Sequence, residues 1–121
     1  MGLVSGDVTG GCHCGAVRFA VRGDFSAAIS CNCSICEKRG HLLAFVPAAD
    51  FSALSGEEEL VDYQFNRHII HHLFCRSCGI QPFARAVSPD GRDMVAVNIR
   101  CIDGVDLAAV KVSAYDGRHA A

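Results

Sequence analysis

The sequence predicts a mainly β protein that forms one domain over residues 1–121. Short apolar runs rich in β-branched or aromatic residues recur along the chain, and Gly, Asp, Ser and Pro separate them. No stretch keeps a helical period of 3.6 residues over three turns. A chain of 121 residues, half of them apolar, is long enough to bury a core of its own.

Five segments have the composition of strands, and VRFAV and MVAVNI alternate imperfectly, as half-buried strands do. In chain order they are VRFAV (17–21), LLAFV (42–46), LVDYQF (60–65), IIHHLF (69–74) and MVAVNI (94–99). SICEKRG (34–40) is predicted to be a short helix that ends at Gly40. Residues 50–59 contain a glycine and three consecutive glutamates, and are predicted to be a solvated connection.

Charge and hydropathy exclude several classes of partner. The net charge of −2 gives no basic face for nucleic acid, and no apolar run approaches the ~18 residues of a membrane span. The N-terminal segment MGLVSGDVTGG lacks the basic and apolar regions of a secretory signal. We therefore expect a cytoplasmic protein whose thiols stay reduced.

Eight cysteines are many for such a chain, and they are clustered. In a reducing compartment, tight clusters favour metal binding over disulfides. The groups are Cys12 and Cys14; Cys31, Cys33 and Cys36; Cys75 and Cys78; and Cys101 alone.

Two of these clusters have the pattern of zinc knuckles. CHCGAV (12–17) and CRSCGI (75–80) each contain Cys-Gly followed by an apolar residue. The glycine allows a turn with positive φ, in which backbone N–H groups can face the thiolates. Together the two knuckles offer four thiolates, the ligand set of a closed structural zinc site. The alternative is that some of these cysteines are inert, buried thiols.

The remaining cluster, CNCSIC (31–36), offers three thiolates and leaves one zinc position open. Zinc with three thiolates carries a net charge of −1 and is therefore a poor Lewis acid toward water. Zinc hydrolases generally use histidine and carboxylate ligands, which keep the metal electrophilic. Such a site is better suited to holding a fourth thiolate from a substrate.

Three cysteine motifs in a fixed order carry a family resemblance. They are Cys-x-Cys-Gly-x-Val-Arg-Phe at 12–19, Cys-x-Cys-x-x-Cys at 31–36 and His-x-Phe-Cys-x-x-Cys-Gly at 72–79, with VNIRCIDGVD (97–106) and YDGR (115–118) following. The chain resembles the glutathione-dependent formaldehyde-activating enzyme family, which also includes centromere protein V. The resemblance implies a β-tent fold with two zinc ions per chain. It places the structural zinc at Cys12, Cys14, Cys75 and Cys78, and the catalytic zinc at Cys31, Cys33 and Cys36.

The resemblance also implies an activity: condensation of glutathione with formaldehyde to S-hydroxymethylglutathione, formally a carbon–sulfur lyase reaction. Its partners would be a small-molecule thiol, with glutathione as substrate or ligand, and an aldehyde. Lys38 and Arg39 follow the three cysteines and could contact a glutathione carboxylate. The alternative is that they form the solvated end of a short helix.

The histidines are expected to play lesser roles. His72 is predicted to pack in a strand beside the structural site, and His71 to face the opposite side of that strand. His41 and His68 could donate protons near a pocket, although surface placement is favoured. His13 could be a ligand, but the cysteines on both sides make it redundant.

Two features outside the clusters are expected to be structural. Cys101 is predicted to be a core residue. Asp103, Gly104 and Asp106 have the composition of a turn.

Other functions remain open at this stage. The three-cysteine zinc could bind a thiol without catalysis, as a carrier. The same cysteines could form a disulfide and act as a redox sensor. A zinc module that binds nucleic acid or a protein partner is disfavoured by the balanced charge.

Overall fold

The computed structural model describes residues 5–64 and 70–117. Within these ranges it has ten strands, one α-helix and four short 3₁₀ helices. The strands are β1 (Ser5–Gly11), β2 (Arg18–Asp24), β3 (Ala27–Cys31), β4 (Leu43–Pro47), β5 (Phe51–Ser55), β6 (Leu60–Tyr63), β7 (His71–Cys75), β8 (Phe83–Val87), β9 (Asp93–Asn98) and β10 (Lys111–Tyr115). The helices are α1 (Cys36–Arg39) and the 3₁₀ turns η1 (Ala48–Asp50), η2 (Glu57–Glu59), η3 (Ile99–Cys101) and η4 (Leu107–Ala109).

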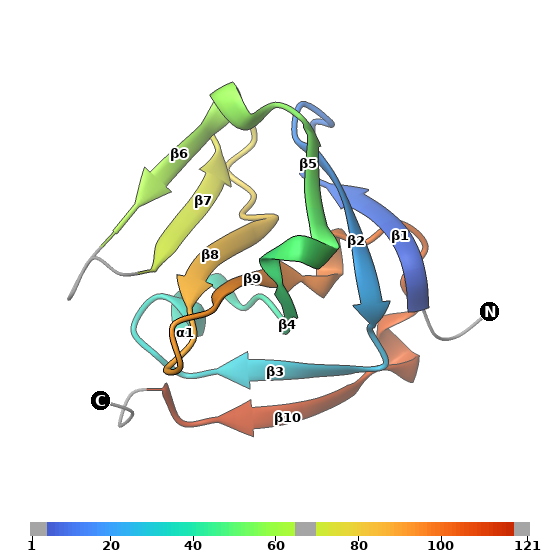
Figure 1. The fold of residues 1–121 in the computed structure, drawn as a ribbon, viewed down its shortest axis with the longest axis vertical. Coiled ribbons are helices and arrows are strands. Elements are labelled where there is room, and N and C mark those ends of the chain that lie inside the picture. Colours follow the sequence, from blue (N-terminus) through green and yellow to red (C-terminus); the bar gives the residue numbers. More distant parts are fainter. Residues whose placement is uncertain (1–4, 65–69, 118–121) are drawn as a thin grey trace.

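The strands form two sheets. The smaller has the order β1-β2-β5, and the larger has the order β10-β3-β4-β9-β8-β7-β6. Neighbouring strands are antiparallel except β10 and β3, which run parallel. In Figure 1 the strands lie along three sides of a triangle: β6 to β8 on one slope, β1, β2 and β5 on the other, and β3 with β10 along the base. The mainly β prediction and the β-tent architecture are confirmed.

The five predicted strands correspond to β2, β4, β6, β7 and β9, with ends shifted by one to three residues. Residues 65 and 69, at the ends of two predicted strands, lie outside the described residues. The predicted short helix is α1, and it ends where expected. Gly40 adopts φ 70°, and its N–H donates to the Cys36 carbonyl at 2.9 Å, closing the last turn.

The prediction for residues 50–59 is wrong in its first half. Phe51–Ser55 forms β5, which pairs with β2 in the smaller sheet, and the Phe51 side chain is buried. The three glutamates form η2, in which no residue is buried. The strand was missed because Phe51 is its only buried residue and its other side chains are small or exposed.

The core lies between the two sheets and contains a cluster of aromatic rings. Phe19 of β2 lies 5.4 Å from Phe51 and 6.1 Å from Phe83 of β8, measured between ring centroids, and Phe51 lies 4.5 Å from Phe83. This cluster packs β2 and β5 of the smaller sheet against β8 of the larger sheet. The turns that carry Cys12, Cys14, Cys75 and Cys78 lie at the ends of strands that enter it.

In the two described ranges, no helix is long and apolar enough to cross a membrane. The single α-helix has four residues.

Candidate metal centres

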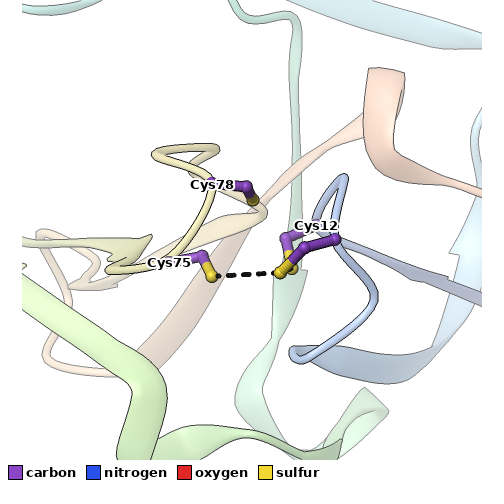
Figure 2. A group of neighbouring side chains, drawn as sticks. Cys12, Cys75 and Cys78 are labelled. Carbon is purple, nitrogen blue, oxygen red and sulfur yellow. Dashed lines mark hydrogen bonds between the residues drawn. The ribbon is translucent and has the colours of Figure 1, made fainter.

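The first candidate centre joins two turns that are far apart in the sequence. Cys12 and Cys14 lie between β1 and β2, Cys75 ends β7, and Cys78 lies in the turn that leads to β8. Figure 2 shows Cys12 facing Cys75 and Cys78 across the gap between the two turns. The four sulfurs lie within 4.8 Å of one another, and the Cys14 Sγ is 3.6 Å from the Sγ atoms of both Cys12 and Cys75.

Both turns have the backbone geometry of zinc knuckles. Gly15 and Gly79, each directly after a second cysteine, adopt φ of 83° and 80°. The Gly79 N–H donates to the Cys75 carbonyl at 2.8 Å, and the Val17 N–H donates to the Cys12 Sγ at 3.4 Å. The positive φ predicted from the Cys-Gly pattern is therefore present, and a backbone N–H faces a sulfur as expected.

The electrostatics of this group favour an anionic sulfur at Cys78. Burial opposes ionisation, but the N–H groups of Ile80 and Cys14 and the thiols of Cys12 and Cys75 outweigh it and lower the pKa of Cys78 to about 6. At Cys14 the Ala16 N–H favours the thiolate, but the neighbouring thiols prevail and raise its pKa to about 11.

The spacing of the sulfurs suits zinc. Tetrahedral coordination with Zn–S bonds of about 2.3 Å places sulfurs about 3.8 Å apart. The 3.6 Å separations in this group are close to that value and far from the ~2.05 Å of a disulfide. All four ligand positions can be filled from this chain, so the group could hold a metal ion in a closed site.

The second candidate centre is built by one short segment. Cys31 ends β3, Cys36 begins α1, and Cys33 lies in the turn between them. Their sulfurs also lie within 4.8 Å of one another. The Cys33 N–H donates to the Cys31 Sγ at 3.4 Å, and the Glu37 N–H donates to the Cys33 carbonyl at 2.9 Å, so that the first turn of α1 folds the segment back on itself.

Within this group ionisation is most favoured at Cys33. Burial opposes its ionisation, but the N–H groups of Cys36 and Ile35 and the neighbouring thiols outweigh burial and lower the pKa of Cys33. Burial is the main cause that raises the pKa of Cys31 and of Cys36. Three sulfurs within 4.8 Å of one another make a donor set that suits zinc and leaves one tetrahedral position unfilled.

A pocket of about 420 Å³ opens beside the three sulfurs, and Cys31 and Cys36 form part of its wall. The other lining residues come from the end of β3 and the residue after it, from α1 and its capping glycine, and from the end of β10 and the residue after it: Ser30, Asn32, Glu37, Gly40, Ala114, Tyr115 and Asp116. This pocket was not predicted from the sequence, because β10, which forms one of its walls, was not predicted.

The parallel pairing of β10 with β3 places residues 115–117, called the chain end below, beside the three-cysteine segment. The Asn32 N–H donates to the Tyr115 carbonyl at 3.1 Å, and the Asn32 amide donates to the Asp116 carboxylate at 3.0 Å. Gly117 then packs against Cys31 so closely that an added Cβ would lie 2.5 Å from the Cys31 Sγ. A glycine is required there by space alone. The motif YDGR, quoted above only for its family resemblance, thus includes part of the site.

His41 is buried, so the expectation of surface placement is wrong. It is 5% exposed, and its Nε2 lies 3.1 Å from the Cys36 Sγ. Burial, followed by the charges of Arg39 and His72, lowers the pKa of His41 to about 4, and the ring is therefore neutral at neutral pH. The sequence could not reveal this contact, because His41 lies beyond the end of α1 and its direction depends on the turn at Gly40.

The other histidines do not join either sulfur group. In β7, His72 is buried while His71 is on the exposed side, where its Nδ1 lies 2.6 Å from the Asp62 carboxylate, so the predicted alternation is confirmed. Among the described residues, neither group of potential ligand atoms within 4.8 Å includes a histidine, and His13 is exposed. Burial, followed by the charge of Arg39, lowers the pKa of His72. His68 lies outside the described residues.

Lys38 and Arg39 are both exposed, and among the described residues neither lines the pocket. The Arg39 guanidinium lies over the Phe74 ring, 5.2 Å from its centroid, and donates to the Gln81 side chain. Arg39 is thus directed toward the β7 side of the sheet, and contact of Lys38 or Arg39 with glutathione stays a prediction.

The remaining predicted features are structural. Cys101 lies in η3, partly exposed but packed against the core, and burial raises its pKa to about 11. Asp103 accepts hydrogen bonds from Arg18 and, at 2.9 Å, from the Thr9 hydroxyl, while Asp106 caps η4 by accepting from the Ala108 N–H at 3.1 Å. Turn and cap chemistry explain both aspartates, as expected.

Comparisons with known proteins agree with this geometry. The sequence model of the glutathione-dependent formaldehyde-activating enzyme family matches residues 7–117. The fold is similar to the crystal structure of a Rhodobacter sphaeroides protein, with a TM-score of 0.75 and 34% sequence identity. That similarity covers 87% of this chain and 99% of the other.

Proposed function

The chain belongs to the glutathione-dependent formaldehyde-activating enzyme family, and on that basis we propose that it adds a thiol, with glutathione the first candidate, to formaldehyde or a related aldehyde. The thiol would bind at a zinc ion held by Cys31, Cys33 and Cys36. The observation that carries this proposal is a cluster of three sulfurs, two of whose cysteines, Cys31 and Cys36, line a pocket of about 420 Å³.

The contrast between the two sulfur groups supports different roles for them. Cys12, Cys14, Cys75 and Cys78 could supply all four ligands of a tetrahedral site between two turns, and a metal there would hold β1–β2 and β7–β8 together. Cys31, Cys33 and Cys36 leave one position for a ligand from outside. Because the pocket reaches two of these three residues, a small molecule has a route to that position.

Zinc at the three-cysteine site would keep an incoming thiol ionised at neutral pH. In the proposed reaction the thiol sulfur would form a C–S bond to the aldehyde carbon, and the electron pair of the C=O double bond would move to the oxygen. That oxygen takes up one proton, so the proton lost by the thiol is balanced by the proton on the new hydroxyl group. Solvent water would supply this proton.

The chain's own residues contribute position and shape. The backbone hydrogen bond from Asn32 to Tyr115 and the side-chain hydrogen bond from Asn32 to Asp116 fix the chain end as one wall of the pocket. A fixed wall limits the orientations of both reactants, and orientation accounts for much of the rate gain available to a bimolecular addition.

The test is the exchange rate between glutathione and its hydroxymethyl adduct in formaldehyde, measured by two-dimensional exchange NMR with zinc-loaded protein. We expect the rate to rise in proportion to protein concentration for the wild type and to stay at the uncatalysed value with Cys33→Ser. Saturable binding of glutathione without any rate increase would instead identify a thiol carrier.

A redox sensor is the second candidate, and the lowered pKa of Cys33 favours it, because a thiolate is the reactive form in disulfide formation. Zinc analysis distinguishes the two. A sensor purified under reducing conditions would hold zinc only at the four-cysteine site.

A further inference from the structure

Each sulfur of the three-cysteine site has a hydrogen-bond donor beside it. Cys31 accepts from the Cys33 N–H at 3.4 Å, and the Cys33 thiolate is stabilised by the N–H groups of Cys36 and Ile35. The Cys36 Sγ is contacted by a side chain instead, the imidazole of His41, at 3.1 Å from Nε2. Both partners of this contact are buried, so water competes little with it.

The position of His41 is that of a donor and not of a fourth ligand. The potential ligand atoms that lie within 4.8 Å of one another at this site are the three cysteine sulfurs, and neither ring nitrogen of His41 is among them. A zinc-bound thiolate can accept a hydrogen bond but cannot donate one, so the Nε2 atom must carry the proton. The Nδ1 atom, which has no hydrogen-bond partner in the part of the chain that the structure describes, then holds the lone pair.

The reaction proposed above creates a problem of selectivity that this contact can solve. An aldehyde in the pocket meets the substrate sulfur, but Cys36 also forms part of the pocket wall. Attack by Cys36 would place the hydroxymethyl group on the protein and remove a zinc ligand. The substrate sulfur must therefore be the better nucleophile.

We propose that His41 is a positioning residue whose hydrogen bond to Cys36 suppresses the nucleophilicity of that ligand, so that the aldehyde is attacked by the substrate sulfur and not by the protein. This inference rests on the proposed function, since it needs zinc at the three-cysteine site.

The size of the effect follows from the link between basicity and nucleophilicity. A hydrogen bond to a charged group lowers its basicity by a factor of about 10 to 100. Thiolate nucleophilicity changes with roughly the 0.4–0.5 power of basicity, so losing the bond should raise the reactivity of Cys36 by about three- to eightfold.

The experiment compares His41→Leu, which removes the donor, with His41→Gln, whose amide can place a donor near the former Nε2 position. His41→Met is a second donor-free variant. Each protein, loaded with zinc and kept in excess zinc, is treated with iodoacetamide, and alkylation of each cysteine is followed by peptide mass spectrometry. Cys31 and Cys33 serve as internal references within the same site.

We expect alkylation of Cys36 to be about three- to eightfold faster in His41→Leu and His41→Met than in the wild type, and close to the wild-type rate in His41→Gln. The sulfur-to-metal charge-transfer band of the cobalt-substituted proteins should shift to lower energy in the two donor-free variants, because their Cys36 thiolate is a stronger electron donor. This second readout does not depend on access of the reagent to Cys36.

Unchanged Cys36 alkylation together with an unchanged cobalt band would overturn the inference while leaving the proposed function in place. Loss of one zinc per chain in His41→Leu and His41→Met would also overturn it, because His41 would then be a ligand. Only one zinc per chain in the wild type would reject the proposed function and this inference together.

Discussion

Gly117→Ala tests whether the chain end after β10 shapes the three-cysteine site. The added methyl would lie 2.5 Å from the Cys31 Sγ and 3.3 Å from the Cys33 Cβ. The first distance is about 1 Å shorter than a comfortable contact between heavy atoms. Either Cys31 moves away from the other two sulfurs or the chain end lifts off the pocket.

The expected magnitude follows from the cost of overpacking a well-packed site, about 1–3 kcal/mol. If that cost is taken from zinc binding, zinc affinity at the three-cysteine site falls by about 5- to 150-fold. The assay is competitive zinc titration against a chromophoric chelator, which resolves the weaker of the two sites. Zinc at the four-cysteine site should be unaffected.

Gly91→Ala is the matched control, because it makes the same chemical change in a distant turn where the new methyl meets nothing within 4 Å. Its positive φ of 88° makes it a control for general destabilisation, at a cost of about 1 kcal/mol or more. If Gly117→Ala binds its second zinc as tightly as Gly91→Ala does, the close packing of the chain end on Cys31 is refuted.

Three further predictions concern the two centres and one surface ion pair. Cys78→Ser should lower the free energy of unfolding in urea by on the order of 4 kcal/mol or more, whereas Cys33→Ser should change it by less than about 1 kcal/mol and abolish the acceleration of thiol addition; equal losses of stability would contradict separate roles. A zinc chelator should empty the three-ligand site first, and the urea midpoint should stay unchanged until the second zinc leaves. Zinc per chain is followed by elemental analysis, and simultaneous release of both ions would argue against one open and one closed site. Arg18 lowers the pKa of Asp103 below its ordinary 3.8, so the stability that Asp103 contributes is present at neutral pH and is lost as pH falls through the lowered pKa. Since the two side chains are 35% and 52% exposed, that contribution is under about 1 kcal/mol, and the urea-unfolding difference between wild type and Asp103→Asn should shrink from pH 7 to pH 3; a difference that grows would contradict the ion pair.

The sequence predicted those parts of the site that depend on local chemistry. Cysteine spacing identified both sulfur groups, and the glycine after Cys14 and after Cys78 predicted the positive φ found at Gly15 and Gly79. Gly40 marked the end of α1 for the same reason. Each of these features is decided within a few residues.

The parts that were missed depend on contacts between distant segments. β10 is the short segment Lys111–Tyr115, and it becomes a strand because it pairs with β3, more than 80 residues earlier. All of its side chains are exposed, so its sequence lacks the alternation of apolar and polar residues that predicts a half-buried strand. The contact of His41 with Cys36 likewise depends on the direction in which the chain leaves α1.

The zinc content of the wild-type protein, purified under reducing conditions without chelator, tests the central claim most directly. We expect two zinc ions per chain by elemental analysis, and one in Cys33→Ser. A ratio of one in both proteins, which added zinc does not raise, would show that Cys31, Cys33 and Cys36 hold no metal and would contradict the proposed enzyme.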